Sequence, residues 1–167
     1  MSVRIPNEIL PEIIPEQMKS PNCQIYFTSV FESQTFTKSL NFLIGKKTII
    51  FFYPRANTPG CTAEACKLRD HYQELTSLGF QLIGVSADNS KKQKSFADKY
   101  ELPFTLLADE EKVVIGAFGV WGPKKFQGRE YDGIHRITFI INQECVVEHV
   151  ISKVKTKDHA TQILTAL

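Results

Sequence analysis

The chain has 167 residues, of which 43% are hydrophobic and 11% aromatic, which suits one packed domain better than two. Its formal net charge of +2 gives no indication of a nucleic-acid partner, and no apolar run approaches the length of a membrane span. Because Glu8, Glu12 and Glu16 interrupt the N-terminus, no secretory signal or transit peptide is expected, and we interpret residues 1–167 as a single cytoplasmic domain without a membrane partner.

The N-terminal region predicts an extended arm followed by a hairpin. Half of the eight prolines fall in residues 1–21: Pro6, Pro11, Pro15 and Pro21. This spacing favours an extended arm over regular structure. Residues 24–31 are rich in β-prone side chains, and residues 32–34 predict a turn into a second strand over residues 35–37.

From residue 48 onward the pattern alternates between strands and helices. Residues 48–53 form an almost continuous apolar run that ends at Pro54, as expected for a strand buried on both faces. The elements predicted after it are a helix over 62–78, a strand over 80–86, a helix over 91–100, a strand over 104–107, a helix over 111–118, strands over 137–141 and 145–151, and a helix over 158–167. This order predicts an α/β fold of three layers.

The residues best suited to catalysis are concentrated in the segment 52–66, FYPRANTPGCTAEAC. Thr58 and Pro59 form a helix-start signal, with Thr58 as N-cap and Pro59 at the first helical position. Gly60 removes side-chain bulk, so a small molecule can approach the backbone N–H groups of Gly60 and Cys61. Cys61 falls in the first helical turn, where unpaired N–H groups and the helix dipole favour an anion. It is therefore a candidate nucleophilic thiolate.

An inert, packed Cys61 is the alternative, since free cysteines are often buried. Helical spacing places it on an inward face with residues 65, 68, 72 and 75. Its position at a helix start after a strand end is also where α/β sheets bind ligands. We interpret Cys61 as reactive.

Cys66 follows five residues later on the same predicted helix, about 140° further around the axis. An ideal helix separates the two Cα atoms by roughly 8.6 Å, beyond the ~7 Å limit for a disulfide. The pair can bridge only if the helix partly unwinds. The spacing matches neither a Cys-x-x-Cys redox pair nor common zinc spacings, and a spectator helix residue is the alternative interpretation.

The motifs together resemble a known family. Pro54-x-x-x-Thr58-x-x-Cys61 resembles the active-site signature of peroxiredoxins. The segment from Thr58 to Cys66 is similar to the bacterioferritin comigratory protein branch, also called peroxiredoxin Q. A second block, FGVWG at 118–122 followed by YDGIHR at 131–136, agrees. The resemblance runs from about residue 46 to the C-terminus, whereas the N-terminal third departs from the usual pattern.

The resemblance implies a thioredoxin-like fold, with a mixed sheet flanked by helices, that reduces hydrogen peroxide or organic hydroperoxides. It implies that Cys61 is the peroxidatic cysteine and that Arg136 polarises thiolate and peroxide. Thr58 would hydrogen-bond the thiolate or the peroxide, and Pro54 would shield the site from water. Cys66 matches the resolving cysteine of a disulfide within one helix. Thioredoxin or a similar dithiol is the implied reductant, no metal or other cofactor is expected, and a monomer suffices.

Other residues are given structural interpretations. Glu64 is expected to support the helix as a first-turn carboxylate, with proton handling as the alternative. Without the resemblance, Arg136 would be read as a surface ion pair. Trp121 is expected in the core or as a lid over the site. Cys23 and Cys145 lack metal-ligand spacing, so packing is expected. The histidines form no His-x-x-x-His pair, and none is chosen as a general base: His71, His135, His149 and His159.

Two competing functions are compatible with a reactive cysteine pair. A thiol–disulfide oxidoreductase on the same fold would carry Cys-x-x-Cys at the helix start, which this chain lacks. A redox sensor or holdase would keep the same cysteines but pass oxidation to a partner. Steady turnover of peroxide separates a peroxidase from both.

Overall fold

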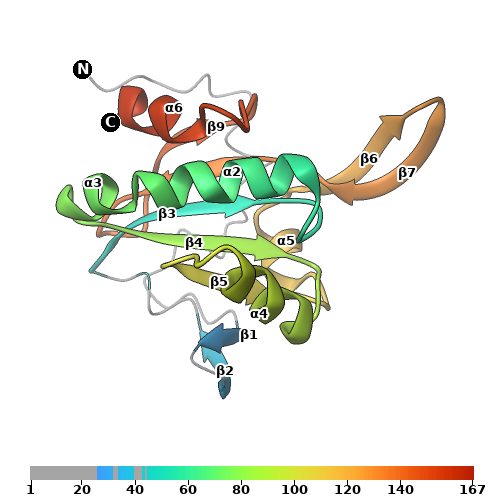
Figure 1. The fold of residues 1–167 in the computed structure, drawn as a ribbon, viewed down its shortest axis with the longest axis horizontal. Helices are drawn as coiled ribbons and strands as arrows, with labels where there is room; N and C mark the ends of the chain where they lie inside the picture. Colours follow the sequence, from blue (N-terminus) through green and yellow to red (C-terminus); the bar gives the residue numbers. More distant parts are fainter. Residues whose placement is uncertain (1–25, 32–33, 40–42, 44) are drawn as a thin grey trace.

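A mixed sheet of seven strands forms the centre of the molecule in the computed structural model, which describes residues 26–31, 34–39, 43 and 45–167. Its strands are β1 (Tyr26–Phe31), β2 (Gln34–Ser39), β3 (Lys47–Phe52), β4 (Phe80–Ser86), β5 (Thr105–Ala108), β8 (Thr138–Ile141) and β9 (Val147–Ile151). Their order is β2-β1-β5-β4-β3-β8-β9 (Figure 1). The central strands β3, β4 and β5 are parallel, and the flanking pairs are antiparallel.

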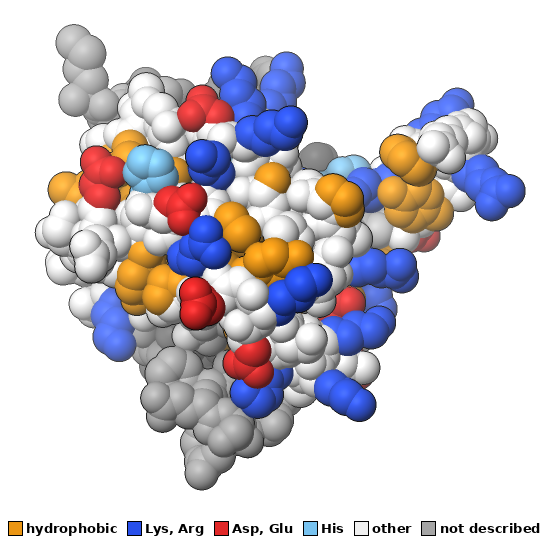
Figure 2. Space-filling view, viewed as in Figure 1, with side chains coloured by type: hydrophobic (Ala, Val, Ile, Leu, Met, Phe, Trp, Pro, Cys, Tyr) orange, Lys and Arg blue, Asp and Glu red, His pale blue; other side chains and the backbone are white. Residues whose placement is uncertain are grey.

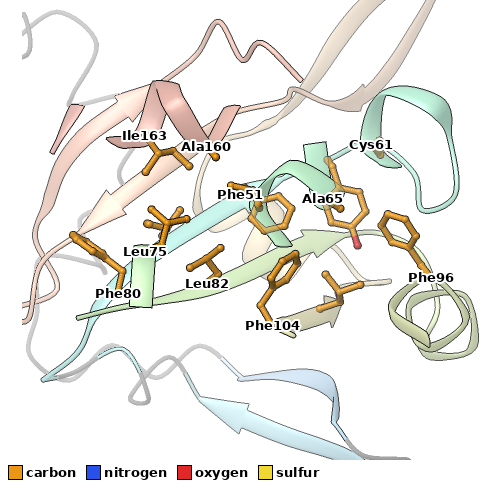
Figure 3. Packing of buried hydrophobic residues seen from close by; sticks show 14 of the residues in the cluster. Phe51, Cys61, Ala65, Leu75, Phe80, Leu82, Phe96, Phe104, Ala160 and Ile163 are labelled. Carbon is orange, nitrogen blue, oxygen red and sulfur yellow. The ribbon is translucent and has the colours of Figure 1, made fainter. Parts of the chain in front are cut away.

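Helices cover both faces of this sheet. They are α2 (Pro59–Asp70), α3 (Tyr72–Ser77), α4 (Ser90–Lys99), α5 (Val113–Ala117) and α6 (His159–Ala166). Alternate residues of β3 point to opposite faces, as a pleated strand requires. Ile49 and Phe51 pack in the core cluster shared with α2, α3, α4 and α6, whereas Ile50 and Phe52 pack in the cluster that holds α5 (Figures 1 and 3). The predicted three-layer α/β fold is confirmed.

The predicted N-terminal hairpin is also confirmed, because β1 and β2 pair antiparallel from Tyr26↔Ser39 to Phe31↔Gln34. The interpretation of residues 1–21 as an extended arm lies outside the described residues, as does Cys23. Within the described part of the chain, no helix is both long and apolar enough to cross a membrane.

The predicted helix over 62–78 is wrong in its extent, because the chain forms two helices. The first begins at Pro59, and the break falls at His71, whose backbone has φ −104° and ψ 12°. Leu68 before the break and Leu75 after it are both fully buried. The apolar periodicity therefore continues across the break, so the sequence pattern does not reveal it.

Other boundaries also differ from the prediction by one or a few residues. Helix α5 is shorter than residues 111–118, because Lys112 adopts a left-handed backbone with φ 59° just before it. Strand β8 begins at Thr138, so Arg136 lies in the segment that leads into it. Strand β9 begins at Val147 rather than residue 145, because Cys145 occupies the preceding turn with φ 62°.

The sequence interpretation missed a two-stranded hairpin, β6 (Trp121–Phe126) and β7 (Arg129–Ile134). Its turn residues Gln127 and Gly128 both have positive φ, 49° and 78°, the geometry that suits a tight hairpin. Figure 1 shows the hairpin projecting from the body of the protein beyond the start of α2. Most of its residues are exposed, so no buried-face alternation marks it.

Candidate active site

The N-terminus of α2 begins as the sequence predicts. Thr58 is the N-cap residue, with an extended backbone at φ −88° and ψ 154°, and Pro59 opens the helix. The first helical bond runs from Thr62 N–H to the carbonyl of Thr58 at 2.9 Å. The Thr58 hydroxyl makes no cap bond and instead donates to the carbonyl of Arg55 at 2.9 Å. The predicted N-cap is confirmed as a position but not as a side-chain hydrogen bond.

The loop between β3 and α2 is held from the end of β4. Asp88 accepts a hydrogen bond from Ala56 N–H at 2.7 Å and another from the Ser86 hydroxyl at 2.9 Å, both to Oδ2. Asp88 is 32 residues from Ala56 in sequence, so no local pattern indicates the contact. This carboxylate fixes the backbone that leads to Thr58.

Cys61 faces inward, as its helical spacing predicts. Its side chain is 2% exposed and belongs to the core cluster that includes Ala65 and Phe96 (Figure 3). Arg136 Nη2 donates to Cys61 Sγ at 3.3 Å. A Cβ built on Gly60 would lie 3.5 Å from the same Nη2, so the glycine leaves open space beside the guanidinium. The structure therefore brings Gly60, Cys61 and Arg136 together.

Arg136 binds a second acidic group with its other terminal nitrogen. Nη1 donates to Glu64 Oε2 in a close ion pair, and Glu64 is fully buried while the Arg136 side chain is 20% exposed. Burial works against the charge of Arg136, but the neighbouring Glu64 and Cys61 raise its pKa. Glu64 is therefore a buried partner of the arginine. Its interpretation as a first-turn carboxylate is wrong, because α2 begins at Pro59 and its first turn holds no acidic residue.

Burial changes the protonation of Glu64. It raises the pKa of the carboxyl group to about 7, against the lowering effect of Arg136. A second buried titratable group lies beside it: His159 Nε2 is 3.6 Å from Glu64 Oε1. From the sequence His159 has no expected role, because the four histidines form no His-x-x-x-His pair and none is chosen as a general base.

Cys66 lies on the same unbroken helix as Cys61 and is half-buried. Both side chains are free thiols. An intact helix holds two cysteines with this spacing too far apart for a disulfide. We therefore predict that the pair can bridge only after α2 partly unwinds.

A pocket of about 780 Å³ adjoins the site between the hairpin and the start of α4. Pro54 and Thr58 line it on one side, and Trp121 and Lys124 of β6 line it on the other. Trp121 is 40% exposed, so it borders the pocket and is not a core residue. Figure 2 shows hydrophobic and Lys or Arg side chains gathered on the projecting hairpin.

Lys124 is a residue that the sequence interpretation missed. Its ammonium group donates to the carbonyl of Ile134 at 2.8 Å across the hairpin. Burial lowers its pKa, and the nearby charge of Arg136 lowers it further. No sequence signal marked it, because the hairpin that carries it was not predicted.

No group of three or more His, Cys, Asp or Glu side chains within the described ranges is arranged to hold a metal ion. Arg136 Nη2 contacts Cys61 Sγ, so the site places a thiol beside a guanidinium. Such a thiol suits nucleophilic attack, because the positive charge stabilises the thiolate and any negative charge that develops on a leaving group.

Comparisons with known proteins agree with this chemistry. The sequence pattern of the AhpC/TSA family matches residues 21–150. The putative peroxiredoxin Bcp of Haemophilus influenzae is 50% identical over 141 residues, which cover 84% of this chain and 90% of the relative. The peroxiredoxin Bcp of Escherichia coli K12 is 47% identical over 123 residues, covering 74% of this chain and 79% of the relative.

Solved structures show the same fold. A Xanthomonas campestris bacterioferritin comigratory protein, studied for its alkyl peroxide reduction activity, superposes with a TM-score of 0.78 at 29% identity. The superposition covers 86% of this chain and 88% of that one. A cysteine-to-serine variant of Xanthomonas campestris peroxiredoxin Q superposes with a TM-score of 0.77 at 31% identity over 85% and 88% of the two chains. The predicted thioredoxin-like peroxiredoxin fold is therefore confirmed.

Proposed function

This chain belongs to the AhpC/TSA family as a peroxidase of the Bcp and peroxiredoxin Q type, and we propose that it reduces hydroperoxides with the thiolate of Cys61. The observation that carries the proposal is the 3.3 Å contact between Arg136 Nη2 and Cys61 Sγ at the start of α2. Hydrogen peroxide and organic hydroperoxides are the proposed substrates. Organic ones are supported by the alkyl peroxide reduction named for the Xanthomonas campestris relative.

The first step is attack of the Cys61 thiolate on the terminal peroxide oxygen. The S–O bond forms as the O–O bond breaks, and the remaining oxygen departs as hydroxide or alkoxide and takes up a proton. Cys61 becomes a sulfenic acid. Arg136 and the backbone N–H groups of Gly60 and Cys61 stabilise the negative charge on the departing oxygen.

Thr58 and Pro54 orient the peroxide and exclude water. The Thr58 hydroxyl donates to the carbonyl of Arg55, which leaves its oxygen lone pairs to accept a hydrogen bond from the hydroperoxide O–H. Pro54 lines the pocket beside Thr58 and presents no N–H group to solvent. The adjoining pocket offers space for the organic part of a larger hydroperoxide.

Cys66 is the proposed resolving cysteine. Its thiol condenses with the Cys61 sulfenic acid, which forms the S–S bond and releases water. The first turns of α2 unwind before this step, because the intact helix holds the two cysteines too far apart. A disulfide within one helix needs no second subunit, so a monomer is sufficient.

Thioredoxin or a similar dithiol is the proposed reductant. Exchange with the Cys61–Cys66 disulfide returns both thiols and oxidises the external dithiol. We also propose the cytoplasm as the compartment, since such dithiols keep thiols reduced there. The cycle needs no metal or other cofactor, and no nucleic acid takes part.

Turnover tests the proposal against a redox sensor or holdase. With thioredoxin, thioredoxin reductase and hydrogen peroxide, we expect steady NADPH consumption, and Cys61→Ser reduces it to the protein-free rate because the nucleophile is gone. Cys66→Ser consumes about one peroxide per chain and then stalls at the sulfenic acid. A wild-type rate no higher than the protein-free control would remove the peroxidase proposal. Full turnover by Cys66→Ser would assign the resolving step to another cysteine.

A further inference from the structure

Glu64 Oε1 is a buried acceptor that receives no hydrogen bond from the described residues. The side chain is fully buried, and Oε2 receives the hydrogen bond from Arg136. Among the described residues, Oε1 has no hydrogen-bond partner. A buried carboxylate oxygen without a donor costs free energy, so a group that supplies a proton there is expected. The group that faces it is His159 Nε2 of α6, at 3.6 Å.

The neighbours of His159 determine which ring nitrogen carries hydrogen. Gln162 donates from Nε2 to the carbonyl of Lys153 at 3.0 Å and accepts at Oε1 from Lys155 N–H at 2.7 Å. These two bonds fix the orientation of the amide. Its Oε1 also lies 3.2 Å from His159 Nδ1, so Nδ1 must be the donor in that contact. In a neutral ring, Nε2 is then a bare acceptor.

Two acceptors on fully buried side chains therefore face each other: a carboxylate oxygen and a ring-nitrogen lone pair. We propose that Glu64 Oε1 and His159 Nε2 hold a single proton between them, and that this pair is a positioning unit for Arg136 at the Cys61 sulfur. Thr138 Oγ1 lies 2.8 Å from the same nitrogen, and its hydroxyl donates to Nε2 when the nitrogen is bare and accepts from it when the nitrogen carries the proton.

The charged groups around the pair explain its effect on the reaction. Arg136 contacts Glu64 Oε2 and Cys61 Sγ at the same time. Lys124 of the hairpin interacts electrostatically with both Arg136 and Cys61. With the proton bound, the Glu64–His159 pair has no net charge, and the guanidinium acts mainly on the sulfur. After the proton is released to solvent, the carboxylate competes with the sulfur for the same guanidinium.

Burial favours the protonated pair near neutral pH. It raises the pKa of Glu64 to about 7 and lowers the pKa of His159 to about 4. The carboxyl group is thus the side of the pair that holds the proton near neutrality. The geometry adds that His159 Nε2 is the acceptor that faces this proton, 3.6 Å from Glu64 Oε1.

The ring nitrogens of His159 give a direct test that does not depend on peroxide chemistry. In ¹⁵N-histidine-labelled wild-type protein, we expect the Nε2 signal of His159 to change once between about pH 5.5 and 8.5, while Nδ1 stays protonated. In Glu64→Gln this change disappears, because the amide donates to Nε2 at every pH. An Nε2 signal that does not move in the wild type, or moves equally in Glu64→Gln, overturns the proposal.

Kinetics test the effect on Arg136, a part of the inference that rests on the proposed role of Cys61. We expect His159→Leu to lower the peroxide rate constant about threefold to tenfold below pH 7 and to converge with the wild type above pH 8. Glu64→Gln flattens the profile, and adding His159→Leu to it has no further pH-dependent effect. His149→Leu, a half-buried histidine on β9, keeps the wild-type profile.

The outcomes separate this inference from the proposed function. An equal loss in His159→Leu at every pH means a purely structural histidine and contradicts the positioning role. If His159→Leu does not fold, the ¹⁵N comparison between the wild type and Glu64→Gln still decides the proton. If Cys61→Ser retains peroxidase activity, the proposed function fails, whereas the ¹⁵N result stands by itself.

Discussion

At the start of α2, one guanidinium is shared between a thiol and a buried carboxyl group. Arg136 reaches Cys61 Sγ with Nη2 and Glu64 Oε2 with Nη1. The guanidinium group is planar and carries several N–H donors in fixed directions, which makes this double contact possible. The contact to Glu64 orients the guanidinium, and we propose that the reactivity of the cysteine depends on this carboxyl group three residues further along its own helix.

Replacing Arg136 with Lys keeps the charge but removes the two terminal nitrogens that contact Glu64 and Cys61 separately. We expect the second-order rate constant for hydrogen peroxide to fall about tenfold to a hundredfold, because one ammonium group cannot hold Glu64 and approach the sulfur together. Stopped-flow measurement of the first oxidation step gives this rate directly. Arg69→Lys is the matched control on α2, where the arginine binds Asp70 and the carbonyl of Tyr100. A rate for Arg136→Lys within twofold of the wild type would contradict the interpretation that both contacts of the guanidinium group are needed for the reaction.

The raised pKa of Glu64 has a defined effect on stability. The folded protein keeps the proton up to about pH 7, whereas the unfolded chain loses it near 4.5. The protonated carboxyl group therefore stabilises the fold at low pH, and this contribution is lost as the pH rises from 4.5 through 7. Glu64→Gln lacks this loss, because its amide cannot ionise.

We expect the free energy of unfolding of Glu64→Gln to increase relative to the wild type over this pH window. The increase is about 3 kcal/mol at most, since one pKa unit corresponds to about 1.4 kcal/mol. Urea unfolding at a series of pH values measures it. Glu111→Gln, at an exposed position before α5, should show no such trend. A difference between Glu64→Gln and the wild type that is constant with pH would count against the raised pKa.

Residues with local signals were predicted, and residues defined by distant partners were not. Thr58, Pro59 and the inward-facing Cys61 follow from helix capping and spacing within a few positions. Glu64 and His159 are 95 positions apart in numbering, and only the packing of α6 against α2 brings them together. No pattern within either helix reports such a contact.

Helix α2 carries both cysteines and must open for them to meet. Its inner face packs against Phe51 of the sheet and Ala160 and Ile163 of α6 in one cluster (Figure 3). Glu64 lies between Cys61 and Cys66, so unwinding this stretch also breaks its hydrogen bond with Arg136. We therefore propose two states of the helix, an ordered one that attacks peroxide and an open one that forms the disulfide.

A glycine between the two cysteines tests this opening. Ala63→Gly destabilises the helix by about 1 kcal/mol, so we expect the unwound state and the rate of disulfide formation to increase about fivefold. Rapid alkylation and mass spectrometry after one equivalent of peroxide measure this rate. Ala97→Gly, a similarly half-buried alanine in α4, is the control and should leave the rate unchanged. Equal rates for Ala63→Gly and the wild type would mean that unwinding does not limit resolution.

Elements were predicted correctly where burial gives the sequence a recognisable hydrophobic pattern. Strands β3 and β4 are buried along almost their full length, and their apolar runs were recognised. The β6–β7 hairpin exposes most of its side chains, so its strands carry no alternation, and its turn depends on the positive φ of Gln127 and Gly128. The signal that remained was the Gln-Gly pair, which is weaker than Asn-Gly as a hairpin turn.

At the scale of the whole molecule, three separate parts of the fold converge on one point. The end of β3 leads into the loop fixed by Asp88, α2 begins with Cys61, and the segment before β8 delivers Arg136. The order of strands and helices was enough to predict the three-layer architecture. The strand order and the position of α6 arise from long-range pairing, which the sequence does not display.

The central claim is that Cys61 is oxidised first and that Cys66 resolves it within the same chain. Reduced protein is treated with one equivalent of hydrogen peroxide, alkylated and digested, and the oxidised cysteines are identified by mass spectrometry. We expect a Cys61–Cys66 disulfide within single chains in the wild type and a Cys61 sulfenic acid in Cys66→Ser. A disulfide that joins two chains, or one that leaves Cys61 reduced, would contradict the claim.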